Sequence, residues 1–202
     1  GGLTITELDL LENFSVEHIG SNMLHEVDLA DCRYEPVFTH KSVDKDWIKN
    51  NGMQTIPNTR HANDFTFSPD GLTIECTMAG ENDEAIVLSK LPITEDQEWG
   101  YFEVTILEEG PCSVVAVGFV QPEYSPKALP GWRHNSIGYH GDDGRVFRGD
   151  TSGKLFSETF GEGDVIGAGI NWKTKQLYFT KNGIYVGSPS NSAIDQEYFA
   201  CV

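Results

Sequence analysis

Basic residues are scarce in this chain. Its 202 residues include 14 Lys and Arg against 31 Asp and Glu, for a formal net charge of -17. A field of that sign repels the phosphate backbone of nucleic acids and anionic lipid headgroups. We therefore expect neither a nucleic-acid partner nor binding to an anionic membrane surface.

Long apolar runs and closely spaced cysteines are also missing. No run reaches the length of a bilayer span, so we expect no direct membrane insertion. The four cysteines (Cys32, Cys76, Cys112 and Cys201) contain no close pair of the kind that binds zinc. With no visible secretory leader, they are expected to be reduced thiols in a cytoplasmic protein that needs no cofactor or metal.

Glycine and aromatic residues are plentiful and spread along the chain: 21 Gly, 11 Phe, 7 Tyr and 4 Trp. From residue 64 apolar residues alternate with polar ones, which is typical of strands with one buried face. The strand candidates are Phe65–Phe67, Leu72–Met78, Ile86–Leu88, Tyr101–Ile106, Val114–Val120, Val165–Trp172, Leu177–Val186 and Tyr198–Val202. Val114–Val120 is apolar almost throughout, which favours an inner strand. This spacing predicts an all-β antiparallel sandwich.

The clearest turn signal is Asn182-Gly183, inside the run from Leu177 to Val186. Both residue types accept the positive φ that a two-residue type I′ turn requires. The pattern therefore predicts a hairpin that places Phe179 opposite Val186 and Thr180 opposite Tyr185.

Residues 1–60 lack this alternation, and we interpret them as a partly helical N-terminal extension that packs on a domain spanning 61–202. Thr4–Glu7 has capping-box spacing ahead of Leu8 and Leu11, which predicts a short helix starting there. Ser42 is the expected cap of a second short helix that runs through Ile48.

One motif invites a metal interpretation: Tyr139-His140-Gly141-Asp142-Asp143-Gly144. Calcium loops need oxygen ligands at alternate positions and a distal Glu, and zinc would need more His or Cys nearby. We favour a strand end followed by a turn, with His140 and Asp142 hydrogen-bonded inside. Arg148-Gly149-Asp150 spells an integrin-type tripeptide, and we interpret it as a turn whose match to that motif is a coincidence.

Several of these segments together resemble the SPRY family. They are Trp99–Val104, Val117–Phe119, Leu129–Trp132, Ser136–Gly144, Phe160–Gly167 and Phe179–Gly183. Leu-Pro-Gly-Trp at 129–132 and Tyr-His-Gly-Asp-Asp-Gly at 139–144 resemble the branch of Ran-binding protein M, the CTLH (GID) ubiquitin ligase and fungal endosomal adaptors. The resemblance implies a bent, concanavalin-like jelly-roll sandwich. It also implies a non-catalytic protein-interaction module, a substrate-recognition or scaffold domain linked to ubiquitin ligase assembly.

The same resemblance implies that a protein or peptide ligand sits on loops at one edge, including Gln121–Trp132. Three prolines in this loop reduce the entropy lost on binding, and exposed Tyr124 and Lys127 would supply contacts. Trp132 is expected to fill a core site. The candidate ligand-binding residues are Tyr124, Ser125, Lys127, Leu129, Arg133 and Asp143.

Two other classes of function stay open at this point. A lectin-like sandwich would show exposed aromatic residues ringed by Asn and Asp, and Trp132 near Asp142 and Asp143 imitates that pattern. A hydrolase is disfavoured because the chain has no Gly-x-Ser-x-Gly motif, although a triad can assemble from distant residues.

Overall fold

A computed structural model of the chain describes residues 3–6, 53–55, 65–69, 72–77, 84–96, 99–109, 114–124, 128–189, 194 and 196–202. These residues form strands and connecting turns. The strands are β1 (Leu3–Thr6), β2 (Met53–Thr55), β3 (Phe65–Phe67), β4 (Ile74–Cys76), β5 (Val87–Ser89), β6 (Trp99–Glu108), β7 (Ala116–Val120), β8 (Ser136–His140), β9 (Arg145–Phe147), β10 (Lys154–Leu155), β11 (Val165–Asn171), β12 (Gln176–Lys181), β13 (Ile184–Gly187) and β14 (Phe199–Cys201).

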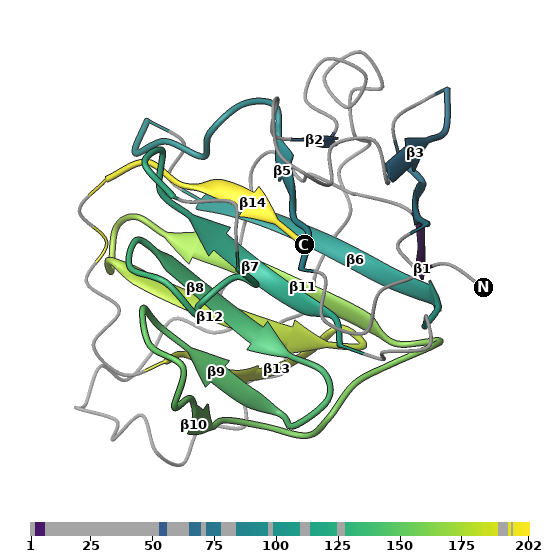
Figure 1. The fold of residues 1–202 in the computed structure, drawn as a ribbon. Helices are drawn as coiled ribbons and strands as arrows, with labels where there is room; N and C mark the ends of the chain where they lie inside the picture. Colours follow the sequence, from purple (N-terminus) through teal and green to yellow (C-terminus); the bar gives the residue numbers. More distant parts are fainter. Residues whose placement is uncertain are drawn as a thin grey trace, which may run out of the picture.

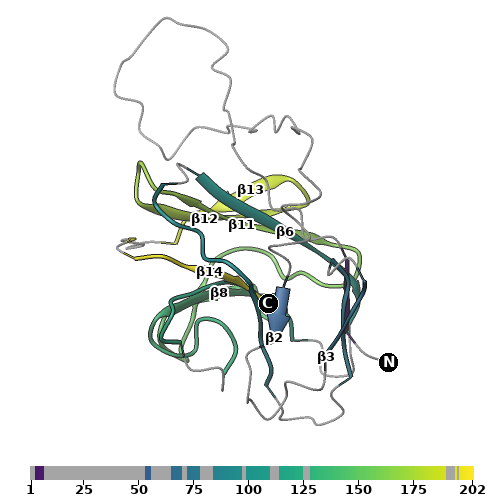
Figure 2. The ribbon, with the colours of Figure 1, turned by 90° about the horizontal axis from the view of Figure 1, so that it is seen from above.

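The strands pair into two seven-stranded sheets (Figure 1). One sheet has the order β13-β12-β11-β6-β1-β4-β3, and the other has the order β10-β9-β8-β7-β14-β5-β2. Seen from above, β6, β11, β12 and β13 form one layer, and β8 and β14 belong to the other (Figure 2). The predicted all-β, antiparallel architecture is confirmed.

The core lies between the two sheets. Alternate residues of β6 and β11 point into it, among them Phe102, Val104, Ile166 and Ile170, each with no exposed surface. Aromatic rings join the layers: Phe102 of β6 meets Phe119 of β7 edge-on with 5.4 Å between ring centroids. The period-two pattern therefore identified the core-facing residues, since burial alternates along a strand that has one dry face.

Strand β7 is buried along its whole length. It lies between β8 and β14 in the middle of its sheet, which confirms the predicted inner strand. The strand candidates Phe65–Phe67 and Leu72–Met78 contain β3 and β4, which pair antiparallel with Phe65 opposite Cys76 and Phe67 opposite Ile74.

The β12–β13 hairpin has the predicted turn, with φ of 54° at Asn182 and 75° at Gly183. Thr180 lies opposite Tyr185, as expected, but Phe179 lies opposite Gly187 and not Val186. A register shift between Phe179 and Thr180 is the reason, since a bulge places an extra residue on one strand of a pair.

The helix predicted to start at Thr4 is wrong, because Leu3–Thr6 forms strand β1 between β4 and β6. Ile5 pairs with Ile74 on one side and Ile106 on the other, so sheet pairing outweighs the local capping signal at these β-branched residues. The second predicted helix, Ser42 to Ile48, lies outside the described residues. β2 pairs with β5, so two segments of residues 1–60 belong to the sheets, and the domain boundary at 61 stays a prediction.

Candidate functional site

The connection between β7 and β8, residues 121–135, contains most of the candidate ligand-binding residues. Its two ends meet where the Gln121 amide donates to the Asn135 carbonyl at 2.8 Å. Within the loop, the Trp132 amide donates to the Leu129 carbonyl at 3.1 Å. The loop therefore begins and ends at one point of the sheet. The residues between these ends determine which side chains are exposed to a partner.

Tyr124 anchors the first half of this loop. Its side chain is 7% exposed and belongs to a cluster with Ile86, Val120 and Cys201. The phenol lies 2.7 Å from the Ala128 carbonyl oxygen and 2.9 Å from that of Leu129, to which it donates. Burial raises the pKa of Tyr124 well above its usual value. The predicted exposure of Tyr124 is therefore wrong: its ring covers the face of the β7-β14-β5 region that points away from the sandwich core.

The second half of the loop is clamped onto β8. His140 is 1% exposed, and its Nε2 lies 2.8 Å from the Pro130 carbonyl oxygen. Gly138 lets the loop approach, because a Cβ there would come within 2.3 Å of the same oxygen. Gly131 has a φ of 94°, and its amide donates to Ser136 Oγ at 2.8 Å. Backbone contacts of this closeness fix residues 130 and 131 against the sheet.

Trp132 is half-buried and lies over His140, with 5.8 Å between the ring centroids. Its ring also meets Phe147 edge-on at 6.3 Å. The indole Nε1 is enclosed, with no hydrogen-bond partner among the described residues. The predicted packing role of Trp132 is thus supported, although the ring caps the outer side of β8 rather than filling the core between the sheets.

The other candidate residues differ in their surroundings. Leu129 is half-buried and Arg133 is exposed, and both belong to the loop. Asp143 lies in the β8–β9 turn, where it accepts the Arg145 amide at 2.9 Å and lies 3.6 Å from the Arg145 Nε. Ser125 and Lys127 lie outside the described residues. A ligand-binding role for this set stays a prediction.

The metal-like motif is a strand end and a turn. His140 is bonded inside as expected, but Asp142 is exposed, so its predicted internal hydrogen bond is wrong. Burial lowers the pKa of His140, which favours the neutral imidazole at this position. The part of the chain that the structure describes contains no group of three His, Cys, Asp or Glu side chains able to hold a metal.

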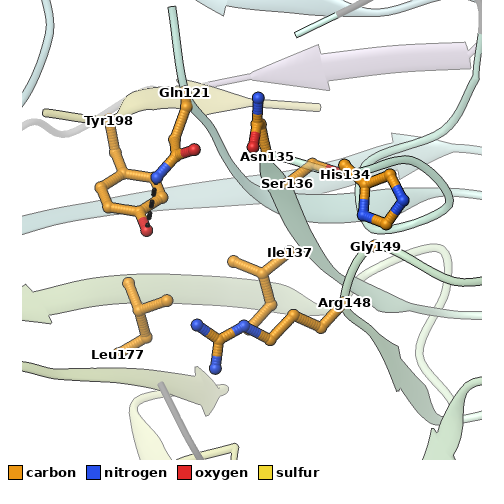
Figure 3. A pocket seen from close by; sticks show the side chains of 9 residues that line it. All are labelled: Gln121, His134, Asn135, Ser136, Ile137, Arg148, Gly149, Leu177 and Tyr198. Atoms are coloured by element: carbon orange, nitrogen blue, oxygen red, sulfur yellow. Dashed lines mark hydrogen bonds between the residues drawn. The ribbon is translucent and has the colours of Figure 1, made fainter. Parts of the chain in front are cut away.

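A pocket of about 340 Å³ opens at the base of the loop (Figure 3). Its lining includes one core residue from each sheet, Ile137 of β8 and Leu177 of β12, which are 2% and 1% exposed. Tyr198 closes one side and accepts a hydrogen bond from Gln121 Nε2 at 3.2 Å. The remaining lining residues are His134, Asn135, Ser136, Arg148 and Gly149.

The pocket lining contains Arg148 and His134 but no carboxylate among the described residues. Asp150 follows closely after Arg148, yet its carboxylate belongs to its own turn. There its Oδ1 accepts Ser152 N at 2.9 Å, Ser152 Oγ at 2.7 Å and Gly153 N at 3.2 Å. These hydrogen bonds lower the pKa of Asp150. The Arg148-Gly149-Asp150 tripeptide is therefore a turn, as predicted, and its arginine contributes to the pocket.

Sequence reasoning missed this pocket. Asn135, Leu177 and Tyr198 come from segments far apart in the chain, and none of the three stands in a motif that signals binding, although Gln121 begins the predicted ligand loop. One local signal marks a turn at the edge of the pocket. Asn135 has a φ of 66°, and asparagine is among the few residues that accept this conformation.

The sequence of this chain is similar to those of proteins of a known family. The SPRY domain family model matches residues 100–202. A Ran-binding protein M homolog of Arabidopsis thaliana is 36% identical over 122 residues, which cover 59% of this chain and 26% of that protein. SPRY domain-containing protein 3 of Homo sapiens is 42% identical over 102 residues, which cover 48% of this chain and 23% of that protein.

A solved structure, a crystal structure of a human SPRY domain, has the same sandwich with a TM-score of 0.56 and 30% sequence identity. The match covers 68% of this chain and 87% of that one. The chain spans about a quarter of the two curated relatives, 26% and 23% of their lengths. Among the described residues, no helix has the length and apolar character that a membrane span requires.

Proposed function

The chain belongs to the SPRY family, and from that premise we propose that it is a non-catalytic module that binds a peptide segment or surface loop of a partner protein. The observation that carries this proposal is the construction of the β7–β8 loop. Tyr124 and His140 fasten the loop to a rigid sheet, while Arg133, His134 and Asn135 stay exposed. The described residues 128–135, held in this way, lose little entropy when a partner binds, and this favours recognition.

The chemistry of the described residues supports binding rather than catalysis. His140 Nε2–H donates to the Pro130 carbonyl inside the protein, and the phenol of Tyr124 likewise donates to backbone carbonyls. A general acid or base must reach a substrate proton in an accessible cleft. Both groups instead hold the loop in place.

We extend the proposal to a substrate-recognition or scaffold domain linked to ubiquitin ligase assembly in the cytoplasm. Its support is the resemblance of Leu129–Trp132 and Tyr139–Gly144 to the Ran-binding protein M branch. Relatives with Ran-binding protein names agree with that branch. The net charge of -17 supports a protein partner over nucleic acid.

The test is affinity purification with the chain as bait, followed by mass spectrometry and binding measurements with the recovered partner. Lys127→Ala, Leu129→Ala and Arg133→Ala should each weaken binding, by about tenfold where the side chain is an anchor. Their melting temperatures should stay near wild type. Glu75→Ala, an exposed change on β4 of the other sheet, is the control and should bind normally.

Partner binding that is unchanged in all three loop variants would contradict the assigned surface. Recovery of a hydrolysed or modified small molecule in place of a protein partner would contradict the module as a whole.

A further inference from the structure

The β12–β13 turn contains an Asn-Gly pair, Asn182-Gly183, and both residues are exposed to water. Asparagine deamidates most readily before glycine, because a residue without a side chain leaves its backbone nitrogen open to close approach. We propose that Asn182 is a site of spontaneous deamidation, and that the folded protein suppresses the reaction by holding the Asn182 side chain. The inference goes beyond the proposed function and is independent of partner binding.

The reaction takes place within the dipeptide. The backbone nitrogen of Gly183 loses its proton and forms a bond to Cγ of Asn182, and the side-chain nitrogen leaves as ammonia. Water then opens the resulting succinimide ring at either carbonyl, which gives aspartate or isoaspartate at position 182. Water is consumed and ammonia is released, with no change of oxidation state. The side-chain amide must turn toward its own backbone for the ring to close, so contacts that fix the amide elsewhere slow the reaction.

Both polar atoms of the Asn182 amide are engaged by the fold. Oδ1 accepts the Val165 amide at 2.8 Å, and Nδ2 donates to Asp164 Oδ1 at 2.9 Å. The backbone amide of Asn182 also donates to the Val165 carbonyl at 2.7 Å. These hydrogen bonds fasten the turn to the start of β11. The two side-chain bonds must break before the amide turns toward the Gly183 nitrogen.

Asp164 is itself held in place. Its Oδ2 accepts the Gly161 amide at 3.0 Å and lies 3.4 Å from Lys181 Nζ. Burial acts to raise the pKa of this carboxyl, but its hydrogen bonds with Asn182 and Gly161 and the nearby lysine charge outweigh burial and lower that pKa. Asp164 is therefore ionised at neutral pH. A hydrogen bond to a charged acceptor is stronger than one between neutral groups, so this contact is the main restraint on the amide.

The product does not fit the same contacts. Aspartate at position 182 replaces the Nδ2 donor with an oxygen that faces the Asp164 carboxylate, so an attraction becomes a repulsion between like charges. Isoaspartate also adds a methylene carbon to the backbone of a turn that requires defined positive φ at both central residues. Deamidation is thus an irreversible loss of hairpin stability, and it accumulates only when the turn opens.

The experiment follows deamidation of Asn182 over time in the folded 202-residue chain by peptide mapping with mass spectrometry. The chain unfolded in urea gives the unprotected rate, and there Asn51-Gly52 is a reference for the same dipeptide. Because the reaction proceeds from the opened turn, the ratio of the two rates equals the fraction of opened turn. We expect the folded chain to react at least about tenfold more slowly, which corresponds to an opening free energy of about 1.4 kcal/mol or more.

Variants assign the protection to one contact. Asp164→Ala removes the acceptor of the Nδ2 hydrogen bond and should raise the rate in the folded chain by about tenfold. Asp164→Asn keeps an oxygen acceptor without the charge and should raise the rate less. Ile74→Val is the control, since it weakens the buried packing of β4 and leaves the turn contacts intact. It should leave the rate at Asn182 unchanged, because opening of the turn is local.

The effect of the product is measured by a double-mutant cycle. Asn182→Asp should lower the melting temperature of wild type, and it should lower that of Asp164→Ala much less, because the facing carboxylate is then gone. Equal losses in the two backgrounds would contradict the repulsion between the two carboxylates.

Equal rates in the folded and unfolded chain would overturn the inference, since Asn182 would then be unprotected. This comparison uses wild type, so it remains valid where Asp164→Ala fails to fold. A rate that both Asp164 variants leave unchanged, or that Ile74→Val raises as much as they do, would also overturn the inference. Reaction of Asn51 without reaction of Asn182 in the unfolded chain would contradict the site. The proposed function is tested separately, by partner capture and the loop variants.

Discussion

The β12–β13 turn and the β7–β8 loop both reverse the chain between neighbouring antiparallel strands, but they are held by different forces. The turn requires positive φ at two residues, 54° at Asn182 and 75° at Gly183, and the Asn182 side chain also accepts the Val165 amide and donates to Asp164. A Cβ added at Gly183 would meet nothing within 4 Å. The loop depends on side-chain anchors in addition to its backbone hydrogen bonds, since Tyr124 and His140 bond to carbonyls several residues away.

This difference affects how variants of the two regions should be interpreted. A change at Gly183 alters the backbone of the turn and little else, because a Cβ there would meet nothing within 4 Å. The anchors of the loop are also part of the packing of the sheet, so their loss affects stability and recognition together. Any assay of the loop therefore needs a measurement of stability beside it.

The largest expected effect is that of Tyr124→Ala. Truncating a buried aromatic residue costs about 3–5 kcal/mol of the free energy of unfolding. Tyr124 is 7% exposed and packs with Ile86, Val120 and Cys201, so its removal leaves a cavity on the outer side of the sheet. Chemical denaturation monitored by tryptophan fluorescence measures the loss.

Tyr124→Phe is the control that separates packing from hydrogen bonding. It keeps the ring and removes the phenol that donates to the Ala128 and Leu129 carbonyls, so it should cost about 1 kcal/mol. A Tyr124→Ala protein as stable as wild type would show that the ring is not buried.

A smaller effect is expected at the turn. Gly183→Val places a β-branched side chain at a φ of 75°, which costs on the order of 1–3 kcal/mol. Because the space around Gly183 is open, the cost is conformational and not steric. Gly183→Asn should lose under about 1 kcal/mol, since asparagine tolerates positive φ. Equal stability of the two variants would contradict a requirement for positive φ at Gly183.

The same contrast explains which features of the structure could be predicted from the sequence. The turn at Asn182-Gly183 and the alternation in Phe102–Ile106 are local patterns, and both gave correct predictions. The environment of Tyr124 is not local, because it depends on β7, β14 and β5 lying side by side in that order. The loop sequence is rich in proline and therefore predicts exposure. Nothing in that sequence signals the apolar surface on which Tyr124 packs.

Two other errors have related causes. Thr4–Glu7 carries a helix-capping pattern, but sheet pairing with β4 and β6 decides the conformation of Thr4–Thr6. The bulge at Phe179 shifts the register of a hairpin whose turn was predicted correctly. The pocket lies beyond sequence reasoning for the same reason as Tyr124, since its lining is gathered from both sheets.

The smallest expected effect concerns pH and the second anchor of the loop. Burial lowers the pKa of His140, and the Pro130 carbonyl together with Asp142 and Asp143 opposes that shift without cancelling it. In the unfolded chain the imidazole returns to its ordinary pKa of about 6.5. Between that value and the lower folded pKa, the unfolded state holds a proton that the folded state does not, so the free energy of unfolding falls as the pH drops below about 6.5.

His140→Gln removes the titrating group while leaving an amide able to donate to Pro130. We therefore expect wild type to lose more stability than His140→Gln in urea denaturation between about pH 7.5 and about pH 5.5. Gly183→Asn, which leaves this anchor intact, should keep the wild-type dependence. Parallel losses of stability in wild type and His140→Gln would show that folding does not lower the pKa of His140. That result would contradict a buried imidazole bonded to the Pro130 carbonyl.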